Sequence, residues 1–396
     1  MKKIYFFAAL AAVALASCSN DEVVQTTQTS PANEINFRPL MGNVTRAVEK
    51  TAFANNDVIS IRANFGSADY FNDTYTFDGT NFKPTTATTH YYWPSDLADA
   101  DGKRMTFYAT YPNSVAAQTG DGAFALTDYD AETDILFAKK VVTTKPSDGV
   151  STMNFRHALS EIDVKVKNTN AGLEVTITGV RVGFIARTAS FSCDELTEPK
   201  ITSATGTSIP NLAQTCWTRI NPTSADADKY TKETGISKTL TGAVTTAQAI
   251  DDDFTPWMFI PQNLETEQGE GNPAYENKYA SNAKGTAVSA PNLKCAYVAL
   301  KMTIKNNDDA KTGIVAEQWC YWPIYTSWEP GKKYTYIIDV AGGGYQPTNV
   351  DETASDELDP VLKGLEIWFD ANSIDTWITD IDEDGTADDI PVSGGI

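Results

Sequence analysis

Cys18 is the residue in this chain whose surroundings point most directly to covalent chemistry. It closes the tetrapeptide Leu-Ala-Ser-Cys at 15–18, after a basic start at Lys2-Lys3 and an apolar run over 4–16. The run is too short for a transmembrane helix, which needs about 20 apolar residues. A basic start, a short apolar run and small residues at its end are typical of a cleaved export signal. We therefore expect residues 1–17 to be a signal peptide.

Small residues directly before a cysteine resemble a lipobox. In such a signal the chain is cut before the cysteine, and its sulfur takes a diacylglycerol. Each buried methylene contributes about 0.8 kcal/mol, so two or more acyl chains hold a protein firmly on a membrane. We expect lipidation at Cys18; the alternative is a plain secretory signal with an incidental cysteine. Residues 18–33 lack core-forming periodicity and are predicted to be a flexible tether. The acidic stretch at 19–22 resembles the signal that sends lipoproteins of Bacteroidetes-type bacteria to the outer face of the outer membrane.

The acidic C-terminal segment is a second place where chemistry is conceivable. Asp380, Asp382 and Asp384, followed by Gly385, match the start of a calcium-binding loop. Pro391 stands where such a loop has a bidentate glutamate, and no flanking helices are evident. We therefore interpret residues 379–396 as a solvated acidic tail, with calcium as the weaker alternative and no other cofactor expected.

Four further cysteines remain in the chain: Cys193, Cys216, Cys295 and Cys320. Four cysteines allow three pairings. We slightly prefer 193 with 216 and 295 with 320, because each pair lies within one region of the chain. Buried thiols that behave as small apolar side chains are the alternative. With two histidines and no Cys-x-x-Cys motif, a zinc site is not expected.

The composition disfavours two classes of function. The net charge is −21, which disfavours nucleic-acid binding because that binding depends on contacts between basic side chains and phosphates. The sequence contains no Gly-x-Ser-x-Gly elbow, no P-loop and no His-Glu-x-x-His motif, so we do not expect an enzyme. A secreted carbohydrate-active enzyme stays open as a third hypothesis, because 52 acidic residues make chance carboxylate pairs easy.

Short apolar runs with alternating polarity indicate an all-β fold. In the run 162–166, for example, Ile162, Val164 and Val166 alternate with Asp163 and Lys165. This period of two is typical of half-buried strands in a sandwich. Strands are predicted over 58–63, 75–77, 105–109, 162–166, 175–182, 297–304 and 334–340. Long surface loops are predicted over 263–290 and 343–362.

An internal repeat bears on the number of domains. Tyr-Trp-Pro occurs at 92–94 and again at 321–323, and Gly102-Lys103 and Gly331-Lys332 follow the two copies at the same distance. Two related sandwich domains with this corner would explain the repeat; chance is the alternative. We place the boundary near residue 160, which gives an N-terminal domain over 47–160 and a C-terminal domain over 161–378.

A series of motifs, in this order and spacing, resembles the fimbrillin-like proteins of Bacteroides and Porphyromonas, the subunits of type V pili. The resemblance runs from the signal peptide to about residue 377. The motifs are Glu-Ile-Asn-Phe (34–37), Val-Thr-Arg-Ala (44–47), Phe-Ala-Asn-Asn-Asp-Val-Ile-Ser-Ile (53–61), Tyr-Trp-Pro (92–94), Phe-Tyr-Ala-Thr-Tyr-Pro (107–112), Phe-Arg-His-Ala-Leu-Ser (155–160) and Trp-Glu-Pro-Gly-Lys-Lys-Tyr-Thr-Tyr (328–336). The resemblance implies two transthyretin-like Greek-key β-sandwich domains.

The resemblance also implies that an arginine-specific surface protease removes the first strand. Arg46, followed by Ala47, is the expected cleavage site; Arg38 and Arg62 are rivals, and Arg38 precedes a proline that most proteases disfavour. The strand removed would span 34–46. Ile35 and Phe37 alternate with polar neighbours and would bury one face of it.

A strand from the next subunit would then fill the open groove. The expected donor is the C-terminal segment, in which Leu365, Ile367 and Phe369 alternate with other residues. A later stretch over 374–378 is a second option, and an ordinary last strand of the C-terminal sandwich is the alternative for the whole segment.

These expectations define a surface subunit that polymerises by donor-strand exchange and supports adhesion. Its partners would be other fimbrial subunits, the outer membrane through the lipid, and the protease. The alternative is a non-polymerising lipoprotein of the same fold that serves as pilus anchor or glycan-binding adhesin. The aromatic residues Trp319, Tyr321, Trp322, Tyr325 and Trp328 could stack on sugars, although core packing is the commoner role of such a cluster.

Overall fold

The computed structural model describes residues 33–40, 52–100, 102–193, 212, 214–220, 231–264, 296–324, 326–347, 358–362, 368–376, 380–381 and 387–388. Within these ranges the regular elements are β-strands and two short 3₁₀ turns, Gln214–Cys216 and Val340–Gly342. None of the described elements is a helix long and apolar enough to cross a membrane.

The strands, in chain order, are β1 (Asn36–Leu40), β2 (Val58–Phe65), β3 (Ala68–Phe77), β4 (Phe82–Pro84), β5 (Met105–Tyr111), β6 (Ala123–Leu126), β7 (Leu136–Val142), β8 (Val150–Asn154), β9 (Arg156–His157), β10 (Ser160–Asn168), β11 (Leu173–Gly183), β12 (Ala189–Ser192), β13 (Trp217–Arg219), β14 (Thr231–Thr241), β15 (Val244–Ala249), β16 (Trp257–Phe259), β17 (Tyr297–Asn306), β18 (Gly313–Pro323), β19 (Lys332–Asp339), β20 (Tyr345–Pro347), β21 (Leu358–Pro360), β22 (Trp368–Thr376), β23 (Asp380–Ile381) and β24 (Ala387–Asp388).

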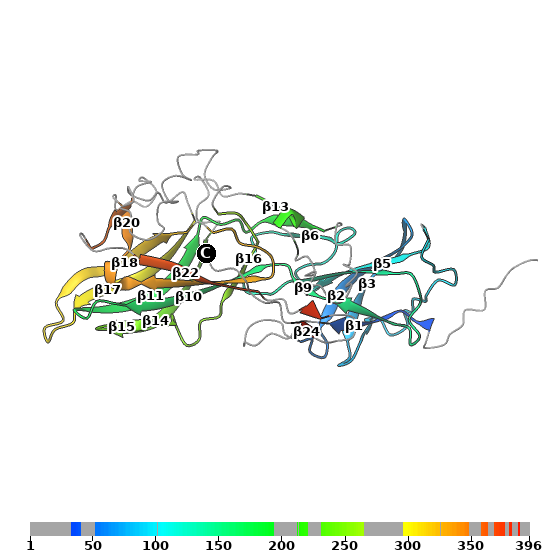
Figure 1. Cartoon of the computed structure of the whole chain (residues 1–396), viewed down its shortest axis with the longest axis horizontal. Coiled ribbons are helices and arrows are strands. Elements are labelled where there is room, and N and C mark those ends of the chain that lie inside the picture. The colour runs from blue at the N-terminus through cyan, green and yellow to red at the C-terminus, as the bar shows by residue number, and fades with distance from the viewer. Residues whose placement is uncertain are drawn as a thin grey trace, which may run out of the picture.

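The N-terminal strands form one sheet in the order β8-β1-β4-β3-β2-β5-β7-β9. Figure 1 labels β1, β2, β3, β5 and β9 of this sheet. Neighbouring strands of this sheet run antiparallel, except that β1 runs parallel to β8. One apolar cluster, drawn from residues between Ile35 and Phe155, packs on this sheet and is rich in aromatic side chains.

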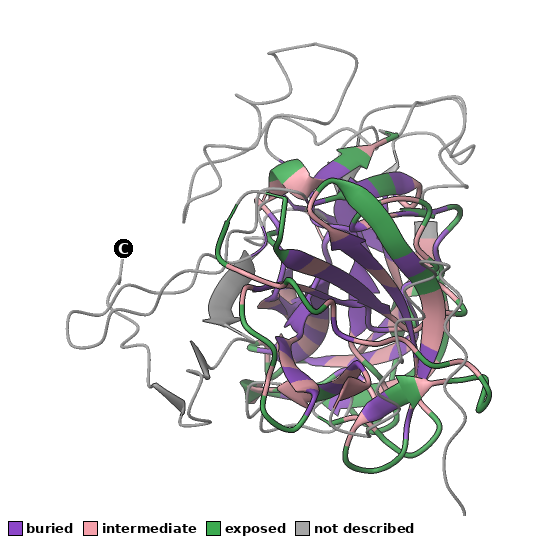
Figure 2. Ribbon diagram, turned by 90° about the vertical axis from the view of Figure 1, so that its right-hand side faces the viewer, coloured by how far each residue is buried: buried purple, intermediate pink, exposed green. Residues whose placement is uncertain are grey.

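Two sheets make up the larger C-terminal part. One has the order β15-β10-β19-β22, with β16 also paired to β10, and the other has the order β14-β11-β17-β18-β20-β21. The apolar faces of their strands form the largest buried cluster. In Figure 2 the buried residues gather toward the middle of the molecule, and the exposed residues lie toward its outside. On β10 the alternation is as predicted: Ile162, Val164 and Val166 are buried, and Asp163 and Lys165 are partly exposed.

A β-bulge keeps β11 amphipathic over its full length. Val175 and Ile177 are buried, and so are Val180 and Val182, although the two pairs differ in sequence phase. The register with both neighbouring strands shifts between Ile177 and Gly179. Since a bulge inserts one extra residue into a strand, it restores the apolar side chains to the same face.

A third, smaller sheet has the order β13-β12-β6 and links the two parts of the chain. β6 comes from the N-terminal part, whereas β12 and β13 follow β11. Phe124 stacks on Phe191 with ring centroids 4.7 Å apart, and Trp217 meets both rings edge-on. Aromatic contacts of this geometry stabilise beyond the area that they bury.

The structure confirms the all-β sandwich class, and each predicted strand falls on an observed one. It differs at 343–362, where a long loop was predicted: β20 and β21 pair with each other there, and β20 also pairs with β18. Both glycines of the repeat, Gly102 and Gly331, have positive φ and precede a strand, β5 and β19 respectively. The domain boundary near residue 160 stays a prediction.

Candidate functional site

The strand β1 is the centre of the site expected from the sequence. Phe37 has 0% exposure, and its ring contacts Tyr75 and Phe107 edge-on, with centroids 5.3 and 5.0 Å away. Ile35 is equally buried, whereas Arg38 points to solvent. The structure thus places both apolar residues of the predicted displaced strand in the core.

β1 is an inner strand, paired on both sides. It forms a five-residue parallel ladder with β8, from Asn36↔Val150 to Leu40↔Asn154. On its other side, Phe37 pairs with Phe82 of β4. Because both flanks are used, removing β1 leaves unpaired backbone groups along β8 and β4 as well as an uncovered apolar floor.

Neighbouring backbone groups extend these pairings at both ends of the segment. Ile35 N–H donates to the Tyr91 carbonyl at 2.8 Å, and Trp93 N–H donates to the Asn33 carbonyl at 3.0 Å. At the far end, Phe155 N–H donates to the Leu40 carbonyl at 2.9 Å. The segment 33–40 is therefore held over its whole described length.

Polar side chains add little to this attachment. The Arg38–Asp148 ion pair spans 3.4 Å with both side chains about half exposed, and His90 Nδ1 lies 2.9 Å from a Glu34 carboxylate oxygen. Exposed pairs of this kind contribute about 0–1 kcal/mol. Burial of a side chain such as Phe37 contributes about 1.5–3 kcal/mol. The strand is held mainly by its apolar face and its backbone ladder.

Several predicted site residues lie outside the described part of the chain. These are Cys18, Arg46, Ala47, Leu365, Ile367, Asp382 and Asp384. Asp380 lies in the short hairpin β23–β24, opposite Asp388. The described residues contain no group of three or more His, Cys, Asp or Glu side chains that could hold a metal ion. The calcium hypothesis therefore stays untested.

The rival cleavage site at Arg62 is poorly placed for a protease. It lies inside β2, between β3 and β5, and its guanidinium contacts Asp69 at 2.8 Å and Asp121 at 2.6 Å. A strand paired on both sides cannot enter a protease cleft without unfolding locally. Arg38, the other rival, is itself part of β1.

The expected donor segment overlaps β22. This strand pairs antiparallel with β19 and ends the order of its sheet, with Phe369 opposite Ile338. In the described chain β22 is therefore the last strand of its own sandwich, which is the alternative named for this segment.

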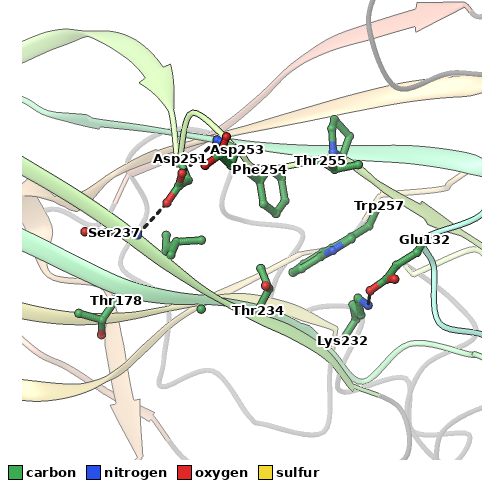
Figure 3. A pocket seen from close by; sticks show the side chains of 13 residues that line it. Glu132, Thr178, Lys232, Thr234, Ser237, Asp251, Asp253, Phe254, Thr255 and Trp257 are labelled. Carbon is green, nitrogen blue, oxygen red and sulfur yellow. Dashed lines mark hydrogen bonds and ion pairs between the residues drawn. The ribbon is translucent and has the colours of Figure 1, made fainter.

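A cleft of about 760 Å³ lies over β14, beside the loop that leads into β16 (Figure 3). Phe254 forms an aromatic wall of the cleft and packs edge-on against the buried Trp257, with ring centroids 5.2 Å apart. Asp251 accepts backbone hydrogen bonds from Ser237 and Asp253, which lower the pKa of its carboxyl group. Beside this turn the cleft offers the Phe254 ring and several hydroxyl groups.

The lining hydroxyl groups come from two strands and the loop. They belong to Thr178, Thr234, Ser237 and Thr255, and Figure 3 shows Thr234 beside the aromatic wall. At one end, Lys232 pairs with Glu132 of the β6–β7 connection. Hydroxyl groups beside an aromatic face can bind a polar ring that has one apolar side.

The tryptophan-rich cluster at 319–328 is mainly core. Trp322 and Trp328 are buried, and Trp328 stacks on Phe259 with centroids 5.4 Å apart. Trp319 is partly exposed, but the Arg181 guanidinium covers its ring at 4.1 Å. The described members of this cluster therefore offer no open stacking face for a sugar.

His157 forms a buried pair with Asp134. Its Nδ1 lies 2.7 Å from an Asp134 carboxylate oxygen, and both side chains are buried. Neither residue lines the described cleft.

The strands that form the walls of the β1 groove carry no clear signal in the sequence. β4 is three residues long and β8 shows no run of apolar side chains, so neither carries a recognisable period of two. The aromatic residues Tyr75, Phe82 and Phe107 that surround Phe37 were visible in the sequence. Their convergence depends on strand order, which a local pattern does not encode.

Two family models match the sequence. A family model described as fimbrillin-like matches residues 45–356, and a model of the prokaryotic membrane lipoprotein lipid attachment site matches residues 1–19. No curated protein matches the chain.

Two solved structures illustrate the similarity. A fimbrial protein from Bacteroides vulgatus is 15% identical, with a TM-score of 0.49, and the match covers 87% of this chain and 100% of that one. A structure from Bacteroides ovatus, described as a candidate cell adhesion protein, is 14% identical with a TM-score of 0.45; the match covers 88% and 99% of the two chains. The family model covers more than half of the sequence, and the chain therefore belongs to the fimbrillin-like family.

Proposed function

We propose that this protein is a structural subunit of a cell-surface fimbria that assembles by protease-triggered donor-strand exchange and supports adhesion. The observation that carries the proposal is the position of β1. It is an inner strand that buries Phe37 and is preceded directly by the buried Ile35, and the sequence between it and the next described residue contains Arg46. One cut after Arg46 would leave β1 attached by non-covalent contacts alone.

Release of β1 would create a groove with a defined chemistry. β8 and β4 would present free backbone groups, and Tyr75 and Phe107 would lose their contact with Phe37. A strand from a second copy can pair with the free backbone groups and cover the exposed aromatic rings, since its backbone completes the ladder and its alternate side chains fill the pocket. We propose the C-terminal segment, from Leu365 to the end of β22, as that donor.

The donor assignment requires that this segment leave its own sheet. Among the described strands, β22 pairs with β19 alone and lies at the end of its sheet. An edge strand gives up one ladder when it leaves, whereas an inner strand gives up two. Leu365, Ile367 and Phe369 would supply the alternating side chains.

The proposed location follows from the N-terminus. Lipidation at Cys18 would anchor the uncut chain, and the acidic residues after it favour the outer face of the outer membrane. The protease partner would be an arginine-specific surface enzyme, and its cut would free the subunit from its lipid.

Replacing Arg46 with Lys tests the proposal while keeping the positive charge. An arginine-specific protease should leave the R46K chain uncut, so cells should accumulate acylated protein that starts at Cys18 and carry few fibres. The control is Arg104→Lys, at an exposed position whose guanidinium pairs with Asp99. N-terminal sequencing and intact mass report the cut, and electron microscopy reports the fibres. Normal fibres that start at Ala47 in R46K cells would contradict the assignment.

A second function, a lipid-retained adhesin of the same fold, rests on the cleft over β14. Its aromatic wall and hydroxyl groups fit the apolar face and hydroxyl groups of a saccharide. Replacing Phe254 with Ala should abolish binding on a glycan array if this function is correct. Thr239→Ala, elsewhere on β14, is the matched control. Unchanged glycan binding by F254A, or no binding by the wild type, would contradict the adhesin function of this cleft.

A further inference from the structure

The small sheet β13-β12-β6 brings two cysteines together. Cys193 directly follows β12, and Cys216 directly precedes β13. The register of these antiparallel strands, from Ala189↔Arg219 to Phe191↔Trp217, puts both cysteines at the same end of the ladder. Their Sγ atoms lie 2.7 Å apart. This juxtaposition comes from the strand register rather than from neighbouring positions in the sequence.

We infer that Cys193 and Cys216 form a disulfide bond in the exported protein, where it fastens the sheet that links the two parts of the chain. The lipid attachment signal directs the chain out of the cytoplasm, and disulfides form and persist in such compartments. The two side chains also differ in access, because Cys193 is buried and Cys216 is partly exposed. Cys216 is therefore the one that an incoming oxidant meets first.

The reaction needs an oxidant, for which we name a thiol–disulfide oxidoreductase in its oxidised form. The Cys216 thiolate attacks one sulfur of that enzyme's disulfide and releases the other as a thiolate. The Cys193 thiolate then attacks Cys216 Sγ and displaces the enzyme. Cys193 and Cys216 together lose two protons and two electrons, and the oxidoreductase leaves as a dithiol.

The position of the bond gives it a mechanical role. The ladder on the other side of β12 joins Ser192 to Ala123 of β6, in the N-terminal part of the chain. Trp217, next to Cys216, donates its indole N–H to the carbonyl of Ala158 at 2.9 Å, just before β10 begins. A covalent link between β12 and β13 therefore fixes the strands that bridge the two parts.

The third described cysteine, Cys320, lies in a less reactive environment. It is buried opposite Leu300 in the β17–β18 ladder, and burial raises the pKa of its thiol to about 12. A thiol in that environment is a poor nucleophile and a poor substrate for oxidation. The second pairing expected from the sequence, Cys295 with Cys320, stays a prediction because Cys295 lies outside the described residues.

Peptide mapping of the wild-type chain tests the inference. Cells that export the protein are treated with N-ethylmaleimide at harvest, which blocks accessible thiols. The chain is then denatured in the presence of iodoacetamide, which alkylates thiols that become exposed, and is digested without reductant. We expect a peptide pair that links Cys193 to Cys216 and disappears on reduction. Alkylation of both Cys193 and Cys216 without reduction would overturn the inference, as would a link from either one to another cysteine.

A thermal melt provides the second measurement. Reductant should lower the melting temperature of the wild-type chain by roughly 5–10 °C, since the bond closes a loop of more than 20 residues. The C193A/C216A variant should melt at the lower temperature with or without reductant. A wild-type melting temperature that does not respond to reductant, in protein shown to be reduced, would contradict the mechanical role.

Discussion

Phe37 makes the main side-chain contact of β1. Its ring has 0% exposure and fills the space between Tyr75 and Phe107. The polar contacts of the same segment are exposed and contribute little. Phe37 therefore stabilises the uncut chain, and the groove opens when Phe37 leaves with β1.

Replacing Phe37 with Ala should lower the free energy of unfolding of the uncut chain by about 3–5 kcal/mol, because it leaves a cavity in an aromatic core. Urea unfolding of the chain without its signal peptide measures this. Arg38→Ala is the adjacent control, and we expect a change of about 0–1 kcal/mol because its ion pair is exposed. If F37A and R38A were equally stable, Phe37 would not be the main contact of β1.

Tyr336 makes the C-terminal core sensitive to alkaline pH. Its side chain is buried, its oxygen accepts a hydrogen bond from Trp328 Nε1 at 2.8 Å, and burial raises its pKa to about 12. An unfolded tyrosine ionises near pH 10. Because the folded pKa is the higher one, the stabilisation is complete below about pH 10 and is lost as the pH rises toward about 12.

Tyr336→Phe should therefore have opposite consequences at two pH values. At neutral pH it should lower the free energy of unfolding by about 1–3 kcal/mol, since the buried indole N–H loses its acceptor. Between about pH 10 and 12, its stability should fall less steeply than that of the wild type. Denaturant unfolding at several pH values measures both effects. A steeper alkaline loss in Y336F than in the wild type would contradict this account.

Among the secondary-structure elements, alternation in the sequence located several of the long strands but not all of them, since β14 and β18, with eleven residues each, were not predicted. β10, β11 and β17 each bury the side chains that a period of two assigns to the core, and a bulge explains the change of phase in β11. The short strands β4 and β8 were not predicted, because three to five residues between turns carry too little periodicity. These strands form the walls of the β1 groove. The sequence could thus identify Ile35 and Phe37 as a buried face but not the strands that receive them.

The register of β1 is specific enough to be tested with a peptide. Residues 33–40 supplied as a peptide should bind the chain that starts at Ala47, raise its melting temperature and block its polymerisation, because a ligand for the folded state stabilises it. The control peptide exchanges Ile35 with Asn36 and Phe37 with Arg38. It has the same composition, but a one-residue shift turns its apolar side chains away from the groove. Equal effects of the two peptides would rule out a register-specific groove.

At the scale of the whole molecule, the dominant property is the net charge of −21. Such a charge keeps an exported protein soluble and separate from its neighbours, because like-charged molecules repel each other. It also opposes the proposed polymer, in which many copies of the same acidic chain lie end to end. The energy for assembly must therefore come from the short-range contacts of the donor strand, which are apolar side chains and a backbone ladder.

Salt should consequently accelerate assembly of the cut protein. The screening length falls from about 10 Å at 0.1 M salt to about 3 Å at 1 M, so the repulsion between approaching subunits shrinks while the apolar contacts do not. We expect the polymerisation rate of chains that start at Ala47, followed by light scattering, to rise with sodium chloride and to reach a plateau once the repulsion is screened. The uncut chain is the control: it should stay monomeric at every salt concentration because β1 fills its groove. A polymerisation rate that falls with salt would contradict this account. It would mean that attraction between complementary charges brings the subunits together, and that the donor-strand contacts do not have to overcome charge repulsion.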